Sequence, residues 1–152
     1  IGYELEKTLS AHGTVSRGVC DVDNNGYLVA INERVKVFKK EKDIVYDDAD
    51  GLHTIPSICK ASMNFWCFHN SVFELSKLMF NDFLKHNINN VKSEFFIPIV
   101  ADEFIKSGKG KIKVIPTSSQ WFGVTYKEDA PNVQESVNKL VISGEYPASL
   151  WQ

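Results

Sequence analysis

Apolar and polar residues alternate along the first part of the chain, which is the pattern of half-buried β-strands. Residues 3–9 predict a short strand, and residues 15–23 and 27–32 predict two more. Asn25-Gly26 lies between the last two, and because Asn-Gly favours the positive φ of a tight turn, we expect a hairpin. Residues 35–46 alternate apolar residues with lysines, which predicts a solvated β-ribbon.

The middle of the chain changes to a helical period. Residues 57–68 are a continuous, mostly apolar run, with Asn64 as its polar exception, and they predict a strand buried on both faces. Ser71 and Glu74 then have capping-box spacing, and apolar residues follow at helical intervals. Pro98 suits the first turn of a second helix, which Gly108 is expected to end.

The last third predicts a strand, a second strand end and a helix. Residues 111–116 alternate as a strand, and residues 121–126 form a buried strand end with one glycine. Asp129 is expected to be the N-cap of a helix that Gly144 ends. The order of elements predicts an α/β fold, as part of a larger mixed sheet flanked by helices.

Composition narrows the class of protein. The 152 residues suffice for one domain with a substantial core. A net charge of −2, with lysines and acids interspersed, argues against a nucleic-acid surface. No apolar run is long enough to span a membrane, and no signal-peptide pattern occurs in these residues. Three cysteines without a CxxC pattern predict reduced thiols, so we expect a cytoplasmic protein.

The start of the chain suggests that an upstream part of the same polypeptide is not included in this sequence. The sequence begins at Ile1 and enters a strand-like pattern at once, without the polar lead-in that domains usually have. We therefore expect a C-terminal fragment of a longer polypeptide. A half-sheet would expose an apolar edge and face, which predicts poor solubility or self-association.

Candidate chemistry is limited to polar residues at predicted strand ends. No GxSxG, HExxH or phosphate-binding glycine loop occurs, and the four histidines lack metal-ligand spacing. Cations would suit a phosphate, and carboxylates or amides would suit sugar hydroxyls. Each of these residues is explained equally well as a cap, a turn residue or a surface ion pair. The residues that could converge on one pocket are Arg17, Glu33, Arg34, Asn64, Glu94, Thr125, Lys127 and Asp129.

Several segments together resemble the C-terminal half of sugar-phosphate nucleotidyltransferases, the nucleoside-diphosphate-sugar pyrophosphorylase family. The resemblance covers nearly the whole chain, residues 121–129 are its most specific part, and the nearest likeness is to a bacterial branch. The matching segments are residues 14–20, 26–28, 32–34, 62–66, 92–98, 121–129, 146–147 and 150–151.

The resemblance implies a Rossmann-like, GT-A-like fold with a mixed sheet. Such enzymes transfer a nucleotidyl group from a nucleoside triphosphate to a sugar phosphate, releasing pyrophosphate with Mg²⁺. Residues 1–152 would be the sugar-phosphate-binding part, inactive alone, because the glycine-rich nucleotide-binding half is not found here. The implied partners are the two substrates, not nucleic acid or membrane, and self-association into a homo-oligomer stays open. The alternative is a degenerate module that binds sugar phosphate or nucleotide without chemistry.

The implied sugar contacts transfer residue by residue. Gly18 matches the glycine whose backbone lies close to the sugar, and Glu33 matches the glutamate that holds sugar hydroxyls. Arg34 stands where the family has a phosphate-binding lysine, and a guanidinium would bind phosphate as a planar fork. Asn64 would line the sugar pocket and Trp121 would wall it.

The largest difference from the pattern of that family lies in residues 121–129. Gly123 occupies the position where many members have an aspartate that binds magnesium. Either substrate phosphates complete the magnesium shell, or Asp129 substitutes from the helix start, or catalysis is altered or lost. Lys127, like Arg34, is a candidate to hold phosphate.

Overall fold

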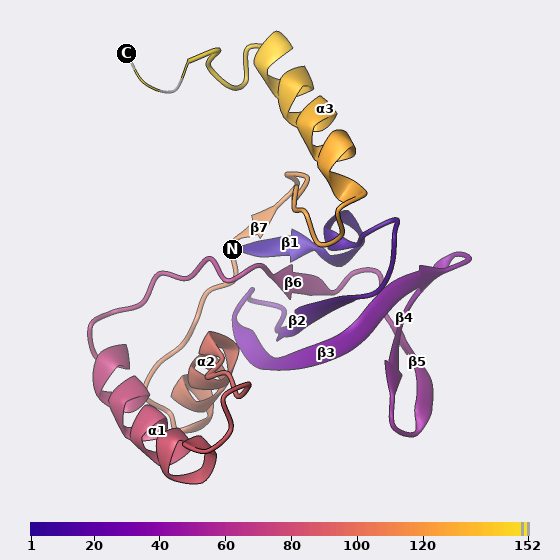
Figure 1. Cartoon of the computed structure of the whole chain (residues 1–152). Coiled ribbons are helices and arrows are strands. Elements are labelled where there is room, and N and C mark those ends of the chain that lie inside the picture. The colour runs from indigo at the N-terminus through magenta and orange to yellow at the C-terminus, as the bar shows by residue number, and fades with distance from the viewer. Residues whose placement is uncertain (150, 152) are drawn as a thin grey trace.

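The chain folds around one mixed β-sheet (Figure 1). We describe residues 1–149 and 151 of the computed structural model, and within them seven strands run in the order β5-β4-β3-β2-β6-β1-β7. β1 and β7 are parallel, and the other neighbouring strands are antiparallel. The α/β prediction with a mixed sheet is therefore confirmed. The strands are β1 Gly2–Glu4, β2 Val15–Val22, β3 Leu28–Lys40, β4 Asp43–Asp48, β5 Gly51–Ile55, β6 Lys60–Ser62 and β7 Pro116–Thr117.

The β2–β3 hairpin forms as predicted. Gly26 has a φ of 78°, which the turn requires, and the Asp23 carboxylate accepts hydrogen bonds from the backbone N–H groups of Asn25 and Tyr27. β3 then continues unbroken through Glu33 and pairs with β4, which pairs with β5. The predicted solvated ribbon is therefore the extended end of the sheet.

Several strand predictions were wrong in extent. Residues 3–9 give β1 and then a 3₁₀ turn, η1 (Leu5–Thr8), and residues 121–126 form a loop. Of residues 57–68 only β6 is a strand, because Asn64 takes a left-handed φ of 58° and the chain leaves the sheet. Residues 111–116 supply an isolated bridge and one residue of the short β7.

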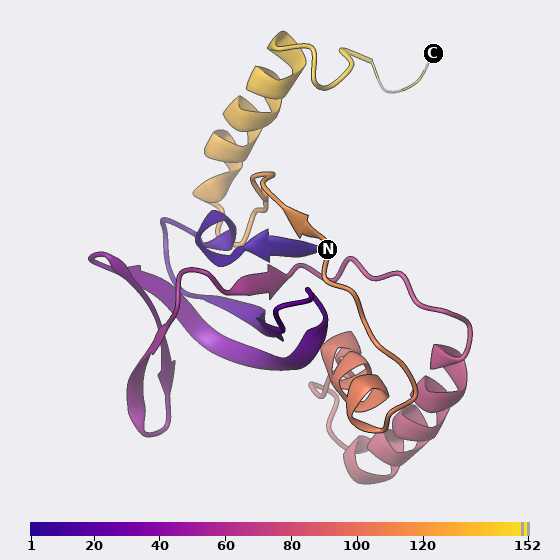
Figure 2. The ribbon, with the colours of Figure 1, turned by 180° about the vertical axis from the view of Figure 1, so that it is seen from behind.

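The helices were predicted at nearly their observed positions, and they are α1 Val72–Asn87, α2 Ile97–Lys106 and α3 Asp129–Ile142. The predicted capping box is wrong, since Ser71 has helical φ and ψ and its side chain makes no capping bond. α1 and α2 share a small core that includes Leu75 and Val100. α3 projects away from the sheet beyond β1 and β7 (Figures 1 and 2).

The two faces of the sheet are covered differently. On the η1 face, the core contains Leu5, Val19 and Ala61. On the opposite face, here the α2 face, Cys20 and Ile31 belong to a core against which residues of α2 pack. Successive residues of a strand point to opposite faces, so this alternation decides where each candidate residue lies.

The C-terminal tail is not docked within the part of the chain described. Tyr146 is 45% exposed and Trp151 is 88% exposed. The sequence of residues 146–147 and 150–151 predicts a docked tail. This prediction is wrong for Tyr146 and Trp151, and Leu150 lies outside the described residues.

Candidate functional site

The candidate residues do not form one pocket, because they lie on both faces of the sheet. Gly18 pairs with Glu33 across β2 and β3, and both belong to the α2 face. Arg17 pairs with Arg34 in the same ladder and belongs to the η1 face. The convergence of all the candidates on a single pocket, left open by the sequence, does not occur.

On the α2 face, a row of mostly small residues crosses the strands in register. Glu33 pairs with Gly18, Gly18 pairs with Ser62, and Ser62 pairs with Gly2. A Cβ atom at Gly18 would lie 3.5 Å from Glu33 Oε2 and 3.1 Å from Ile31 Cδ1. The Glu33 carboxylate therefore reaches over a glycine, and we call Glu33, Gly18 and Ser62 the sheet floor.

The Glu33 carboxylate has an unusual environment for an exposed residue. It makes no ion pair or hydrogen bond with any other residue in the described part of the chain. Partial burial against the sheet raises the pKa of the Glu33 carboxyl, and the charge of Arg17 on the other face opposes that rise. Such an acceptor is available to a ligand with hydroxyl groups.

Two further residues border the sheet floor. The backbone N–H of Asn64 donates to Ser62 Oγ at 3.3 Å, so the turn at Asn64 begins directly beside the floor. Lys60 lies two residues before Ser62 on the same strand and therefore on the same face. Sequence reasoning missed Ser62 and Lys60, although their spacing within a predicted strand was visible.

On the η1 face, Arg17 is buried and its donors are engaged. Nε and Nη2 donate to the carbonyl oxygen of Thr8, the former at 3.0 Å, and Nη1 donates to the Ser16 carbonyl at 2.7 Å. Burial lowers the pKa of the Arg17 guanidinium, and Glu33 opposes this. Arg17 therefore holds η1 to β2 and offers little to a phosphate.

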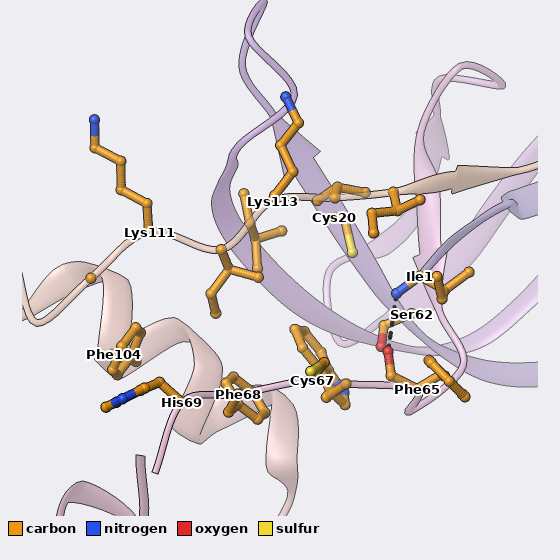
Figure 3. Close-up of a pocket in the computed structure, with 16 residues that line it drawn as sticks. Ile1, Cys20, Ser62, Phe65, Cys67, Phe68, His69, Phe104, Lys111 and Lys113 are labelled. Atoms are coloured by element: carbon orange, nitrogen blue, oxygen red, sulfur yellow. Dashed lines mark hydrogen bonds between the residues drawn. The ribbon is translucent and has the colours of Figure 1, made fainter. Parts of the chain in front are cut away.

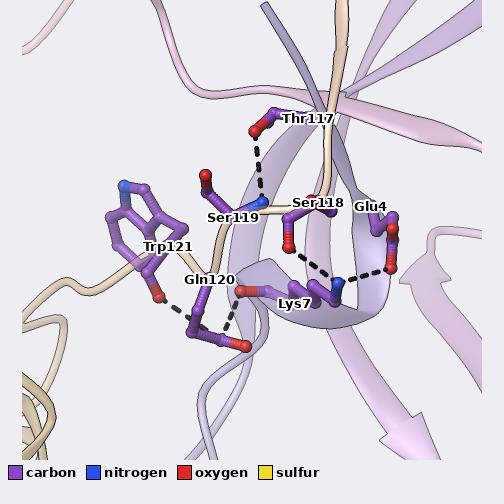
Figure 4. A network of polar contacts seen from close by, with 7 residues as sticks. All are labelled: Glu4, Lys7, Thr117, Ser118, Ser119, Gln120 and Trp121. Atoms are coloured by element: carbon purple, nitrogen blue, oxygen red, sulfur yellow. Dashed lines mark hydrogen bonds and ion pairs between the residues drawn. The ribbon is translucent and has the colours of Figure 1, made fainter. Parts of the chain in front are cut away.

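Trp121 lies under this guanidinium, with the Arg17 Cζ atom 4.9 Å from the ring centroid. The segment leading to Trp121 is fixed by η1 (Figure 4). Lys7 Nζ donates to the Ser118 carbonyl at 2.8 Å and pairs with Glu4 at 3.0 Å, and Gln120 Nε2 donates to the Lys7 carbonyl at 2.8 Å. Trp121 therefore has a structural role, because it packs under Arg17 and the segment before it is held to η1.

Asp129 organises the loop before α3. Its Oδ2 accepts from the backbone N–H groups of Tyr126 at 2.8 Å and Thr125 at 3.1 Å, and its Oδ1 accepts from Ser10 Oγ at 3.1 Å. The Tyr126 N–H, together with the Ser10 and Thr125 donors, lowers the pKa of the Asp129 carboxyl. Asp129 caps the turn that precedes the helix, which corrects its predicted role as the helix N-cap.

These contacts do not fit a magnesium site at Asp129, since both carboxylate oxygens already accept hydrogen bonds. Gly123 cannot be replaced simply by an acid either, because a Cβ atom there would overlap the Trp121 ring. Across residues 1–149 and 151, no three histidine, cysteine or acidic side chains gather closely enough to hold a metal ion. We therefore assign no metal ligand among these residues.

The remaining candidates lie apart from the sheet floor. Arg34 places its Cζ atom 4.6 Å from the ring centroid of Tyr46 on the η1 face. Glu94 is exposed in the connection between α1 and α2, and Lys127 is exposed in the turn before α3.

Two of the cavities in the described part of the chain are lined by candidate residues or by residues close to the sheet floor. A cavity of about 220 Å³ is lined by Trp121, Thr125 and Asp129. A larger one, of about 360 Å³, lies between residues 62–69 and residues 110–115 and is mainly apolar (Figure 3). Its lining includes Trp66, whose buried Nε1 has no hydrogen-bond partner among the described residues. Lys111 and Lys113 extend away from its centre.

A scan against protein-family models and a search of curated proteins both found no match.

None of the helices within the described residues has the length and apolar character needed to cross a bilayer.

Proposed function

We propose that this chain is the sugar-phosphate-binding part of a nucleotidyltransferase with a Rossmann-like, GT-A-like fold. The observation that carries the proposal is the Glu33 carboxylate, which reaches over Gly18 and has no protein partner among the described residues. Gly18 and Glu33 are also two of the positions at which the chain matches the sugar contacts of that family.

The chemistry of the sheet floor suits a sugar. A glycine leaves room for a ring to approach the backbone, and a free carboxylate accepts hydrogen bonds from two vicinal hydroxyl groups. Ser62 adds a hydroxyl in the same row, and Lys60 on the same face supplies a cation for the phosphate. Arg34 is not proposed for this role, because its guanidinium lies on the opposite face.

The contribution of this chain to the reaction would be positioning. A phosphate oxygen of the sugar phosphate attacks the α-phosphorus of the nucleoside triphosphate in line, and pyrophosphate leaves. Holding the sugar by its hydroxyls at Glu33 fixes the attacking oxygen, which lowers the entropic part of the barrier. Magnesium, expected from the resemblance, would neutralise the phosphates, and its ligands would come from outside the residues described.

Titration calorimetry with a panel of hexose 1-phosphates tests the proposal directly. We expect Glu33→Gln to weaken binding at least about tenfold, which is the value of one charge-assisted hydrogen bond. Glu103→Gln, a change to an exposed carboxylate on α2, is the matched control and should bind like the wild type. Absence of binding by the wild type, or equal weakening in both variants, would contradict the proposal.

A second candidate is a binding module without catalysis. Gly123 offers no carboxylate and Asp129 is engaged by the loop, which favours binding over chemistry. Pyrophosphate release distinguishes the two, measured on the longest natural form of the protein with each nucleoside triphosphate. Sugar-phosphate binding without turnover would favour the module.

A further inference from the structure

α1 and its C-cap residue Ile88 carry an apolar stripe that the described part of the chain covers only in part, at Phe80, whose ring packs against Phe83 and Phe95. Phe73, Phe80, Leu84 and Ile88 follow one another at intervals of seven, four and four residues, which places them on one side of a helix with 3.6 residues per turn. They are 73%, 43%, 37% and 73% exposed. Leu75, on a different side of the same helix, is buried against α2.

Charges beside this stripe are self-complementary. Glu74 and Lys85 are eleven residues apart, close to three full turns, so they lie on the same flank of the stripe near its two ends. Glu74 has no ion-pair partner among the described residues, and Lys85 has a loose contact of 3.8 Å with Asp82. Both side chains are exposed and free to meet opposite charges.

We propose that a second copy of this chain docks antiparallel on the α1 stripe. A two-fold axis near Phe80 would bring Phe73 against Ile88 of the second copy. The same axis brings Glu74 close to Lys85 of the second copy, and the reverse pair follows by symmetry, as an isologous interface requires. Lys77 lies in the stripe between Phe73 and Phe80, and its aliphatic stem packs on Leu84 of the second copy while its ammonium stays in water.

The arrangement selects one orientation. In a parallel pair, the flank that carries Glu74 and Lys85 would face the other flank of the stripe, and the two ion pairs could not form. The interface of one helix per copy is small, so we expect a dissociation constant between about 1 μM and 1 mM.

Sedimentation equilibrium of the chain over this concentration range tests the proposal. Phe73→Glu should abolish the dimer, because it places a charge at the end of the stripe. Ile142→Glu is the matched control, since Ile142 is 86% exposed but lies on α3, away from the stripe and its charged flank, and it should leave the dimer unchanged. Circular dichroism of each variant checks that the fold is kept.

A charge exchange tests the orientation. Lys85→Glu should weaken the dimer about fivefold to tenfold, because two surface ion pairs are replaced by repulsion. The double variant Glu74→Lys with Lys85→Glu should restore the original affinity. A wild-type chain that stays monomeric to about 1 mM would overturn the proposal. A dimer that persists in Phe73→Glu would also overturn the proposal. A dimer that is abolished by Val137→Glu on α3 would do the same.

Discussion

Arg17 lies over the ring of Trp121, with 4.9 Å between its Cζ atom and the ring centroid, while its nitrogen atoms donate to the Thr8 and Ser16 carbonyls. One buried side chain thus joins β2, η1 and the loop that leads to α3. Arg17, a candidate for phosphate binding, and Trp121, the expected wall of the sugar pocket, hold these three segments together instead.

Arg17→Lys is expected to destabilise the fold by about 2–3 kcal/mol, although it keeps the charge. A lysine cannot reproduce the planar fork that reaches Thr8, and hydrogen bonds from charged groups contribute about 1.5–3 kcal/mol. Urea unfolding measures the loss. Arg34→Lys is the matched control, since the Arg34 guanidinium also lies over an aromatic ring, Tyr46, and it should cost less than about 1 kcal/mol. Equal losses would argue against a special role for Arg17.

Gly123→Ala is expected to destabilise the fold by about 1 kcal/mol, because its Cβ would overlap the Trp121 ring and push it from beneath Arg17. In a Trp121→Ala background the same change should cost almost nothing, since the overlapping ring is gone. Unfolding of the four proteins in this double-mutant cycle gives the coupling. Additive effects would show that the ring and the glycine do not constrain each other.

Asp129→Asn should loosen the loop before α3 in a pH-dependent manner. The folded pKa of Asp129 is lowered, chiefly by the Tyr126 N–H. Its stabilising contribution is therefore complete above the unfolded pKa of about 3.9 and is lost as pH falls through the folded pKa. The difference in stability between wild type and variant should be largest near neutral pH and shrink in acid.

Hydrogen exchange of the Thr125 and Tyr126 amides gives the local measurement for Asp129. Both amides should be protected at neutral pH in the wild type and exchange faster in Asp129→Asn. Ser143→Ala, at the other end of α3, is the control and should leave them protected. A difference in stability between wild type and Asp129→Asn that grows as the pH falls would contradict the predicted pH dependence.

Asn64→Ala should cost about 1–2 kcal/mol, because a residue with a Cβ and no local polar group is strained at a φ of 58°. Asn64→Gly should be neutral or slightly stabilising. Thermal unfolding separates the two, and hexose 1-phosphate binding adds a second measurement. If the amide touches the sugar, both variants lose affinity, whereas a purely conformational role leaves the glycine variant unaffected.

Local chemistry predicted the parts of the fold that depend on neighbours in sequence. Turn residues and the spacing of apolar residues predict the hairpin at Gly26 and the helices that end near Gly108 and Gly144. All three elements are present. The i,i+4 spacing of Glu135 and Lys139 also predicts a favourable ion pair on the last helix, and the pair forms, at 2.7 Å.

The errors came from contacts between distant segments. Residues 57–68 are mostly apolar, yet the left-handed turn at Asn64 ends the strand there. Asp129 has N-cap chemistry, but Ser10 from another part of the chain and the preceding turn occupy its carboxylate. No local pattern contains that information.

The division of the candidate residues, by contrast, could have been deduced. Arg17 and Gly18 are neighbours in a predicted strand, as are Glu33 and Arg34, and the two-residue period sends neighbours to opposite faces. A single pocket for all four was incompatible with the strands already predicted for them.

Because Arg17 and Gly18 are consecutive residues, the two faces of the sheet are linked through one peptide bond. One peptide plane separates Gly18, at the base of the sheet floor, from Arg17, which rests on Trp121 on the far side. A ligand that displaced the backbone at Gly18 would also shift the Arg17 guanidinium over the indole. The emission of Trp121 would then register occupancy of a site that it never touches.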